Sequence, residues 1–572
     1  MLVFCLDAAT WDVMRPMMER GQLPHLARLC GDGVSGNLET VNPPMTAPAW
    51  VSFLTGRNPG KHGLFGFKWP PQHPAFPDSE SVQVVNSTCY RSHGTLLDIL
   101  SDQGKKVGVI NLPVTYPAWE INGFMVTGFL TPSNVSFTYP PELGEELTRA
   151  IPGYRIDLDF GGGLTGKVHS PVRGDGKEQE LPTPVADKIR NITPAQRRLA
   201  EELEKVNEIR MRAISHLMEK YPDLDCLFLY FRELDELQHF LWHRRDAVES
   251  FYKMIDQRVG EILTQAEHFG RVVVMSDHGF RGATTREFHL NDFLNGCGLL
   301  VPRWSPWWYG TVRQLLKSVS YRLRQMVKRL PWDRRQKLKE RTLGRAPKRL
   351  RRWTARMAFN IEWSKTRAYA LKVDRVLGVN VNLRGREPYG IVEKEEYEDV
   401  RSQVKNKLLA IRDPKTGERV IDRVQDREEV YSGPYVDRLP DLIVVSSPKY
   451  EDRLQLSGSV IRDAPPPSEY TGTHSKAFEG IFIASGDGIK SGEGIDGAHL
   501  LDVTPTLLWM LGCPIDPDMD GHILDAVFET SFRSDEEPVY EASVAGAGEQ
   551  PEELTAEQEQ AVVERLRRLG YW

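Results

Sequence analysis

Three short apolar segments of the chain each lead to an aspartate: residues 2–6 to Asp7, residues 225–230 to Asp235 and residues 271–276 to Asp277. Continuous apolar runs of this length are typical of parallel strands that are buried on both faces. In an open α/β sheet, the carboxyl ends of such strands point toward the ligand crevice. The pattern therefore predicts an α/β sheet with three carboxylates gathered at one edge.

The rest of the chain alternates between helical and strand-like patterns. Apolar residues have helical spacing over residues 11–20, 23–30, 95–103, 193–221, 247–269, 393–411 and 499–511, and further strand-like runs cover residues 34–41, 106–111, 441–446 and 480–485. This alternation predicts a doubly wound, mostly parallel sheet with helices on both faces. Thr555, followed three residues later by Gln558, fits a capping box for a last helix over residues 555–569.

The length of 572 residues allows two to four domains, and breaks in the pattern suggest their boundaries. We expect the first part of the α/β core at residues 1–294 with an insertion at about 129–192, a basic Trp-rich helical insertion at residues 295–366, the second part of the core, including His474, at residues 367–530, and an acidic linker with a short helix at residues 531–572.

One strongly basic block interrupts an otherwise acidic chain. The Arg303–Arg367 block contains 20 Lys and Arg against 3 Asp and Glu, whereas the whole chain has a formal net charge of −6. Residues 312–330 have the pattern of an amphipathic basic helix. Such a helix can lie on an anionic membrane surface, form a solvated lid or an oligomer contact, or simply be a solvated surface helix. Nucleic-acid binding is the less favoured reading. A basic lid would favour anionic substrates.

Cysteine usage and the N-terminus bear on the compartment. The 6 cysteines are scattered without a C-x-x-C pair, which argues against a zinc knuckle and against a disulfide framework. The chain runs directly into a strand-like segment, so we expect no signal peptide. Without a stretch of about 18 apolar residues, we also expect no transmembrane helix. The expected location is the cytoplasm, with the inner face of the membrane as a second location through the basic block.

Histidines accompany the aspartates or a strand. His278 directly follows Asp277, and His239 comes four residues after Asp235, which places that pair on one face of a helix. His474 lies in a Gly-Thr-His loop ahead of a strand. Carboxylates and imidazoles without thiolates suit Zn²⁺ or Mn²⁺. Two such ions about 3.5–4 Å apart would clamp the attacking and leaving oxygens of a phosphoryl displacement.

Thr46 lies among prolines, in Asn42-Pro-Pro-Met-Thr46-Ala-Pro, ahead of a short apolar segment. We interpret it as a nucleophile at the start of a helix, because an ion bound to its hydroxyl would lower the hydroxyl pKa. Each feature by itself has an ordinary explanation: an aspartate at a strand end is usually a turn former or helix cap, and a threonine before Ala-Pro is usually a turn residue. Their joint occurrence favours a metal site.

A second phosphate-binding pattern is weaker. Gly161 to Lys167 satisfies the G-x-x-x-x-G-K spacing of a phosphate-binding loop, but Val168 replaces the Ser or Thr whose hydroxyl holds magnesium. No helical pattern follows it. We therefore interpret this segment as a flexible loop.

The whole set of motifs resembles the type I phosphodiesterase/nucleotide pyrophosphatase family of the alkaline phosphatase superfamily. The matching segments run in order from residue 2 to about residue 525, with the basic block inserted. They are Leu6-Asp7, Pro43-Pro-Met-Thr46-Ala-Pro-Ala-Trp50, Thr55-Gly-Arg-Asn-Pro-Gly-Lys-His62-Gly63, Asp235-x-x-x-His239, Ser276-Asp277-His278-Gly279, Gly472-Thr-His474, Asp502-Val-Thr-Pro-Thr506 and Asp518-Met-Asp-Gly521. Each segment by itself is weak, but the ordered set is highly specific.

The resemblance implies an alkaline-phosphatase-like fold with two zinc-like sites. The implied ligands are Asp235, His239 and His474 for one ion, and Asp7, Asp277, His278 and the Thr46 oxygen for the other. Thr46 would attack phosphorus and form a phospho-threonyl intermediate. Water activated at the first ion would then hydrolyse this intermediate.

One position departs from the family pattern. Eukaryotic-type members carry an Asn shortly after the His-Gly dipeptide, where it stabilises a non-bridging phosphoryl oxygen, and that position here is Phe67. The backbone N–H of Thr46 and the side chain of Asn111 are the expected alternative donors. The departure also weakens the expectation of a nucleotide substrate. A sulfatase is disfavoured, because the chain lacks the C/S-x-P-x-R motif that sulfatases need.

We therefore expect a phosphodiesterase or pyrophosphatase-like hydrolase that acts on a small phosphate ester with two divalent ions, Zn²⁺ in first place and Mn²⁺ in second. A phosphomonoesterase or phosphotransferase of the same superfamily is the alternative within this class. An alternative of another class is a peripheral membrane-binding protein with a vestigial metal site. The complete set of seven metal-site residues argues against that last reading.

Overall fold

The computed structural model describes residues 1–69, 84–132, 135–158, 160–161, 167–168, 181–303, 361–464, 470–533, 536–543 and 555–568. Contacts between residues divide the chain into two compact units. Unit 1 comprises Met1–Ala283, Tyr431–Arg438 and Pro467–Trp572, and unit 2 comprises Thr284–Val430 and Leu439–Pro466.

Unit 1 is built on a nine-stranded sheet. Its strands, in their order across the sheet, are β20 (Glu493–His499), β2 (Gly33–Glu39), β19 (Glu479–Gly486), β9 (Arg271–Met275), β1 (Leu2–Leu6), β8 (Cys226–Phe231), β3 (Val107–Ile110), β4 (Gly123–Val126) and β5 (Thr138–Tyr139). Most neighbours are parallel, while β19 runs antiparallel to both β2 and β9, and β5 runs antiparallel to β4. The expected mostly parallel sheet is confirmed.

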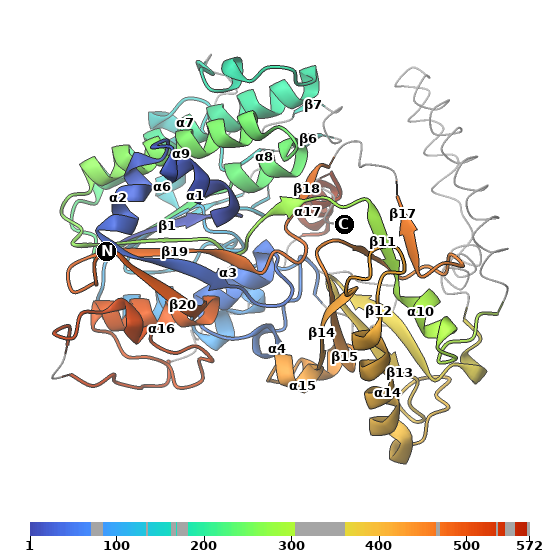
Figure 1. Ribbon diagram of the computed structural model, residues 1–572. Helices are drawn as coiled ribbons and strands as arrows, with labels where there is room; N and C mark the ends of the chain where they lie inside the picture. The colour runs from blue at the N-terminus through green and yellow to red at the C-terminus, as the bar shows by residue number, and fades with distance from the viewer. Residues whose placement is uncertain are drawn as a thin grey trace. The chain divides into compact units, whose positions relative to one another are not determined.

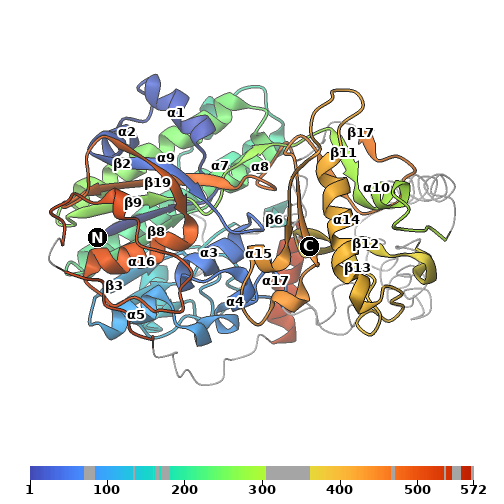
Figure 2. The ribbon, with the colours of Figure 1, turned by 60° about the horizontal axis from the view of Figure 1, so that its bottom comes forward.

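Helices cover both faces of this sheet (Figures 1 and 2). The helices of unit 1 are α1 (Trp11–Glu19), α2 (Pro24–Gly31), α3 (Thr46–Thr55), α4 (Pro59–His62), α5 (Leu96–Asp102), α6 (Glu142–Ala150), α7 (Pro194–Lys220), α8 (Glu233–Leu241), α9 (Arg245–Gln265), α16 (Leu500–Leu511) and α17 (Ala556–Arg568). One face carries α1, α2, α7, α8 and α9, and the other carries α3, α5 and α16. This is the doubly wound arrangement that the sequence predicts.

Local sequence explains the central elements. All residues of β1 and β8 are buried, as continuous apolar runs must be when helices cover both faces of a parallel sheet. The long helix α7 begins at a capping box in which Thr193 and Gln196 bind each other's backbone N–H groups. A second capping box, between Thr555 and Gln558, starts α17 as predicted.

The Gly161–Lys167 pattern does not have the geometry of a phosphate-binding loop. Phe160 and Gly161 form strand β6 (Phe160–Gly161), which pairs antiparallel with β7 (Lys167–Val168). In a phosphate-binding loop the lysine opens a helix, whereas Lys167 here opens a strand. Residues 162–166 lie outside the described residues.

Unit 2 has its own core. Its four-stranded sheet has the strand order β12 (Ala368–Val373), β13 (Val376–Val381), β15 (Leu442–Ser446) and β14 (Ile421–Asp426). A separate three-stranded sheet has the order β16 (Glu451–Arg453), β11 (Arg286–His289) and β17 (Ile461–Asp463). The four-stranded sheet is antiparallel throughout. Its helical partners are α10 (Leu290–Gly296), which packs on β12, and α14 (Tyr397–Ala410) and α15 (Arg427–Val430), which pack on β14.

This division departs from the boundaries expected from the sequence. We expected residues 284–294 in the first part of the core and residues 367–466 in its second part, but nearly all of them group into unit 2. The physical reason is that β13 pairs with β12 on one side and with β15 on the other, and the resulting sheet has an apolar surface that α14 covers with Val400, Val404 and Leu408. Such a layer closes a hydrophobic core by itself.

The predicted basic helix at residues 312–330 lies outside the described residues, so its contact with an anionic membrane stays a prediction. Among the residues that the structure describes, no helix combines the length and the hydropathy that a membrane crossing requires.

Candidate metal centre

Three neighbouring parallel strands bring the predicted aspartates to one edge of the unit 1 sheet. Strand β1 lies between β9 and β8 and is parallel to both. Asp7 directly follows β1, Asp277 comes two residues after β9, and Asp235 lies in the first turn of α8, which follows β8. All three side chains are buried. The carboxyl ends of the strands thus meet at the predicted crevice.

The direction of β19 brings His474 to the same edge. Because β19 runs antiparallel to β9, with Phe482 opposite Met275, the residues that precede β19 lie beside those that follow β9. The His474 ring stacks on the His278 ring with 4.4 Å between centroids, and its centroid lies 5.3 Å from that of His239. The three predicted histidines therefore meet above the aspartates' strands.

The donor atoms form two overlapping groups. In each group, one donor atom per residue lies within 4.8 Å of the others, and the groups are Asp7, Asp277 and His278, and Asp235, His278 and His474. His278 belongs to both groups, whereas the resemblance assigns it to one ion. His239 adjoins the second group, because its Nε2 lies 3.4 Å from Asp235 Oδ1.

Backbone carbonyls fix the orientation of all three histidines. The Nδ1 atom lies 3.2 Å from the Gly472 carbonyl oxygen in His239, 3.1 Å from that of Gly279 in His278, and 2.8 Å from that of Pro44 in His474. Because a carbonyl oxygen can only accept, each Nδ1 carries the proton of this hydrogen bond, which leaves Nε2 as the ring atom that can bind a metal. Histidines that bind metals have this second contact.

Several buried oxygen and nitrogen atoms of the cluster could bind a metal ion, because the described residues leave them without a hydrogen-bond partner. Asp7 Oδ1, Asp277 Oδ2 and His278 Nε2 have no hydrogen-bond partner among the described residues. His278 Nε2 lies 3.2 Å from Asp277 Oδ2 and 3.7 Å from Asp7 Oδ1. An unsatisfied buried polar atom costs about 1–3 kcal/mol, and a cation among these three atoms would satisfy them together. The oxygen and nitrogen donors fit Zn²⁺ or Mn²⁺.

The electrostatics of the cluster also favour a cation. Burial, together with the charges of Asp277 and Asp235, raises the pKa of Asp7 well above its usual range, and burial raises that of Asp277. Burial raises the pKa of Asp235 too, but the neighbouring histidines, His239 above all, together outweigh this effect, and the net direction is downward. Burial and the neighbouring His278 lower the pKa of His474. Divalent ions would offset the cost of burying several carboxylates together.

Thr46 is the first residue of α3, as predicted, and its side chain is buried. Two contacts hold the loop ahead of it: the Pro44 carbonyl binds His474, and the Asn42 carbonyl accepts the Tyr431 hydroxyl at 2.7 Å. The N–H groups in the first turn of a helix have no partner within the helix. The loop therefore joins the start of α3 to a predicted metal ligand.

Asn111 directly follows β3, with φ in the left-handed region at 64°. Its Nδ2 donates to the Thr127 carbonyl at 3.0 Å, and its Oδ1 accepts from Arg210 Nε at 3.3 Å. The amide is thus held in one orientation, and its contact with a phosphoryl oxygen stays a prediction. Phe67 is buried edge-on against Phe129, with centroids 5.6 Å apart, and offers no donor.

Comparison with known families identifies the protein group. The family model described as type I phosphodiesterase / nucleotide pyrophosphatase matches residues 1–458, which is most of the chain. The chain belongs to the type I phosphodiesterase/nucleotide pyrophosphatase family. It is therefore a phosphoric ester hydrolase of the nucleotide pyrophosphatase/phosphodiesterase type.

Solved structures of low sequence identity resemble this chain. Human ectonucleotide pyrophosphatase/phosphodiesterase 5 is 13% identical with a TM-score of 0.46, and the match covers 91% of this chain and 96% of that one. Phosphonoacetate hydrolase from Sinorhizobium meliloti, in complex with phosphonoacetate, is 14% identical with a TM-score of 0.47, and the match covers 88% and 93%.

Two motifs of this family member bind each other. Arg57, in the Thr55–Gly63 motif, reaches Asp516 at 2.9 Å and Asp518 at 2.8 Å, and Lys61 reaches Asp520 at 2.8 Å. Each of the three alternating aspartates, which otherwise have the spacing of a calcium loop, thus already binds a cationic side chain. The two motifs thus connect the segment after α3 to the segment after α16, and their role is structural.

His62 also has a structural role. Its Nε2 lies 2.9 Å from Ser52 Oγ, and its Nδ1 accepts the Leu64 N–H at 3.2 Å, so the buried ring is neutral. Burial, with the nearby His93 and Arg57, lowers the pKa of His62 to about 3. The contact with Ser52 ties the end of α4 to α3, the helix that begins at Thr46.

The low pKa predicts acid sensitivity. An exposed histidine in the unfolded chain has a pKa of about 6.5, so the unfolded state takes up the proton first as the pH falls. His62 therefore costs no stability above about pH 6.5 and lowers it progressively toward about pH 3, by about 2 kcal/mol at pH 5. Urea unfolding of metal-free wild-type and His62→Gln proteins at about pH 7.5 and 5 measures this difference. If both proteins lost the same free energy of unfolding between these two pH values, the prediction would be contradicted.

Gly472 occupies a position where a side chain does not fit. Its carbonyl orients His239, and an added Cβ would lie 2.3 Å from Phe280 Cε1 and 2.6 Å from the Gln238 carbonyl oxygen. We expect Gly472→Ala to weaken metal binding at least about tenfold, because contacts that orient a metal-binding histidine have effects of this size. Chelator competition measures this. Gly31→Ala, where nothing described lies within 4 Å, is the control and should retain wild-type affinity.

Sequence reasoning missed two contacts to the aspartates. The Tyr230 hydroxyl donates to Asp7 Oδ2, and the Ala8 N–H donates to Asp277 Oδ1 at 3.3 Å. Ala8 adopts a left-handed φ of 59°, which is costly for a residue with a side chain. The one signal in the sequence is a tyrosine within an apolar strand, because its buried hydroxyl needs a partner.

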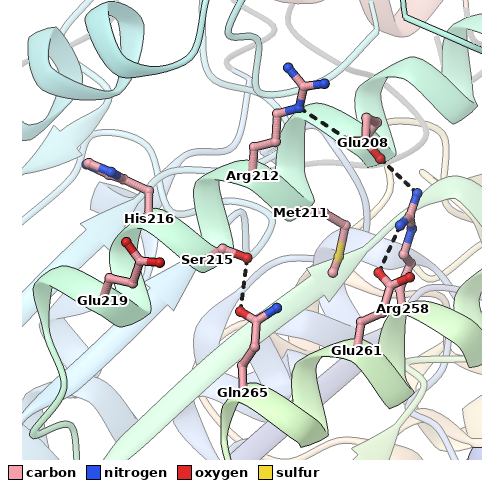
Figure 3. A pocket seen from close by; sticks show the side chains of 9 residues that line it. All are labelled: Glu208, Met211, Arg212, Ser215, His216, Glu219, Arg258, Glu261 and Gln265. Carbon is pink, nitrogen blue, oxygen red and sulfur yellow. Dashed lines mark hydrogen bonds and ion pairs between the residues drawn. The ribbon is translucent and has the colours of Figure 1, made fainter.

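A groove of about 450 Å³ lies between α7 and α9, and within the described structure none of the predicted site residues lines it (Figure 3). Arg258 spans it and binds Glu208 at 2.9 Å and Glu261 at 2.8 Å. Ser215 binds Gln265 across the same groove at 3.0 Å. Most of its polar groups thus bind one another, and this groove carries no ligand proposal.

Proposed function

We propose that Thr46 is the nucleophile of this hydrolase and that two divalent ions, Zn²⁺ or alternatively Mn²⁺, complete its active site. The observation that carries the proposal is the orientation of the three histidines. Each has its Nδ1 on a backbone carbonyl, so that its Nε2 is the ring atom available to a metal ion beside the buried carboxylates. The proposed ligands are Asp235, His239 and His474 for one ion, and Asp7, Asp277, His278 and the Thr46 oxygen for the other.

The reaction would run in two displacements. The Thr46 oxygen forms a bond to phosphorus while the bond to the leaving oxygen breaks, and the hydroxyl proton leaves to solvent or to the leaving group. Water then attacks the phospho-threonine, releases the phosphate product and restores the hydroxyl. When bound, the ions would supply Lewis acidity, which lowers the pKa of an attacking hydroxyl and neutralises charge on the phosphoryl oxygens.

The protein's own donors would complete the site. The first-turn N–H groups of α3, including that of Thr46, suit an anionic phosphoryl oxygen. We propose Asn111 as a second donor, because Arg210 and the Thr127 carbonyl already fix the plane of its amide. Phe67 cannot replace the Asn of eukaryotic-type members, which leaves a phosphomonoesterase or phosphotransferase as the second candidate function.

Paired substrates test the reaction class. We expect the purified protein with Zn²⁺ or Mn²⁺ to hydrolyse bis-p-nitrophenyl phosphate with a kcat/KM at least about tenfold above that for p-nitrophenyl phosphate, a difference of about 1.4 kcal/mol in transition-state binding. A preference for the monoester would replace the diesterase by the phosphomonoesterase. Metal-free protein is the control and should turn over neither substrate.

A further inference from the structure

One buried tyrosine links the nucleophile helix to a proposed metal ligand. Tyr230 lies in β8, is 2% exposed, and donates its hydroxyl hydrogen to Asp7 Oδ2. Strands β8 and β1 are parallel neighbours, with Tyr230 paired to Cys5. The tyrosine therefore belongs to the rigid centre of the sheet and reaches Asp7 from the neighbouring strand.

This hydrogen bond gives the two carboxylate oxygens of Asp7 different surroundings. Oδ2 is engaged by Tyr230, while Oδ1 lies 3.7 Å from His278 Nε2 and has no hydrogen-bond partner among the described residues. Asp277 repeats the pattern, because its Oδ1 accepts the Ala8 N–H and its Oδ2 lies 3.2 Å from His278 Nε2. Each carboxylate thus offers one oxygen, and the pair converges on His278.

The ring of Tyr230 has a second contact, on the side of the nucleophile. The Trp50 ring meets it edge-on, with 5.4 Å between centroids and an angle of 90°. Trp50 comes four residues after Thr46 in α3, so the two lie on one face of that helix. One side chain therefore fixes a carboxylate with its hydroxyl and supports the helix of Thr46 with its ring.

We propose that Tyr230 is a positioning residue that holds Asp7 as a single-oxygen ligand in register with Thr46. The proposal rests on the proposed two-metal function. Without the hydroxyl, Asp7 Oδ2 would lose its donor, and the carboxylate could turn or offer both oxygens. Loss of such a supporting contact typically lowers metal affinity 10–100-fold, whereas a tyrosine that serves only to pack the core would leave affinity unchanged.

The test compares two tyrosine-to-phenylalanine variants of the full chain. Tyr230→Phe removes the hydroxyl and keeps the ring that meets Trp50. Tyr90→Phe is the matched control, because Tyr90 is also fully buried and donates its hydroxyl to a backbone carbonyl, that of Val114, at 3.1 Å. Dissociation constants for Zn²⁺ and Mn²⁺ come from chelator competition. We expect one of two ions to bind about 10–100-fold more weakly in Tyr230→Phe and wild-type affinities in Tyr90→Phe.

Wild-type affinities in both variants would overturn the role of Tyr230. A wild-type protein that binds no divalent ion would instead overturn the proposed function, so the two failures are distinct. If Tyr230→Phe does not fold, 3-fluorotyrosine at position 230 provides a second test, because it preserves packing while making the hydroxyl a stronger donor. Its metal affinity should then differ from wild type, and an unchanged affinity would again reject the proposal.

Discussion

Thr46→Ala protein is expected to retain both divalent ions or lose affinity only modestly, and to lose at least about a thousandfold in kcat with bis-p-nitrophenyl phosphate. The substitution removes one hydroxyl at the first position of α3. Alanine is a better helix former than threonine, and it keeps the backbone N–H. The expected loss therefore reports on the chemistry of the hydroxyl and not on the fold.

Steady-state kinetics measures the loss of kcat, and mass spectrometry measures the number of bound ions. Thr148→Ala is the matched control, because among the described residues the Thr148 hydroxyl binds only its own helix, at the Glu145 carbonyl, and full activity is expected. Thr46→Ser should keep a measurable part of the rate. Acid quenching of wild-type turnover should trap phosphothreonine at position 46. Near-normal turnover in Thr46→Ala would remove the nucleophile assignment.

Asp277→Asn is expected to lose one of the two bound ions and at least about a thousandfold in kcat/KM. The side chain keeps its shape, and Oδ1 can still accept the Ala8 N–H. The oxygen near His278 Nε2 becomes either a neutral carbonyl or an amide that donates, and neither matches a carboxylate as a ligand for a divalent cation. The ion that depends on this oxygen should therefore bind far more weakly.

Metal content after dialysis and the rise of Tm on adding Zn²⁺ measure this loss without relying on activity, since ligands that bind the native state raise its stability. Asp256→Asn is the control: Asp256 is also a buried carboxylate, but it accepts the Leu26 N–H at 2.8 Å and caps α2. That variant should lose stability and keep both ions. Two ions in Asp277→Asn would reject Asp277 as a ligand.

Local sequence carried a large part of the fold and of the candidate site. The run before Asp7 is apolar at every position and the run before Asp277 has an apolar centre, residues 272–275, because helices cover both faces of their sheet, and that property is visible without any partner. The four-residue spacing of Asp235 and His239 needs only one helix turn. The start of α3 at Thr46 follows from the extended residue before it and the apolar segment after it.

The sequence did not predict which strands of residues 367–466 pair with one another. Whether residues 367–466 join the large sheet or form unit 2 depends on β13 pairing with β15, across more than sixty intervening positions in the chain. Apolar runs have the same appearance in either case. Residues 304–360, which are most of the basic block, and residues 162–166 lie outside the described residues, so what the sequence predicts for them stays a prediction.

The sequence by itself determined the type and order of the proposed ligands, because carboxylates at strand ends and a helical Asp-His pair are local features. The tertiary structure decided how they meet. The antiparallel direction of β19 brings His474 to Pro44, which is 430 positions away, and the parallel pairing of β1 with β8 brings Tyr230 to Asp7. Strand direction and neighbour choice depend on which apolar surfaces pair over long separations, and no local pattern encodes them.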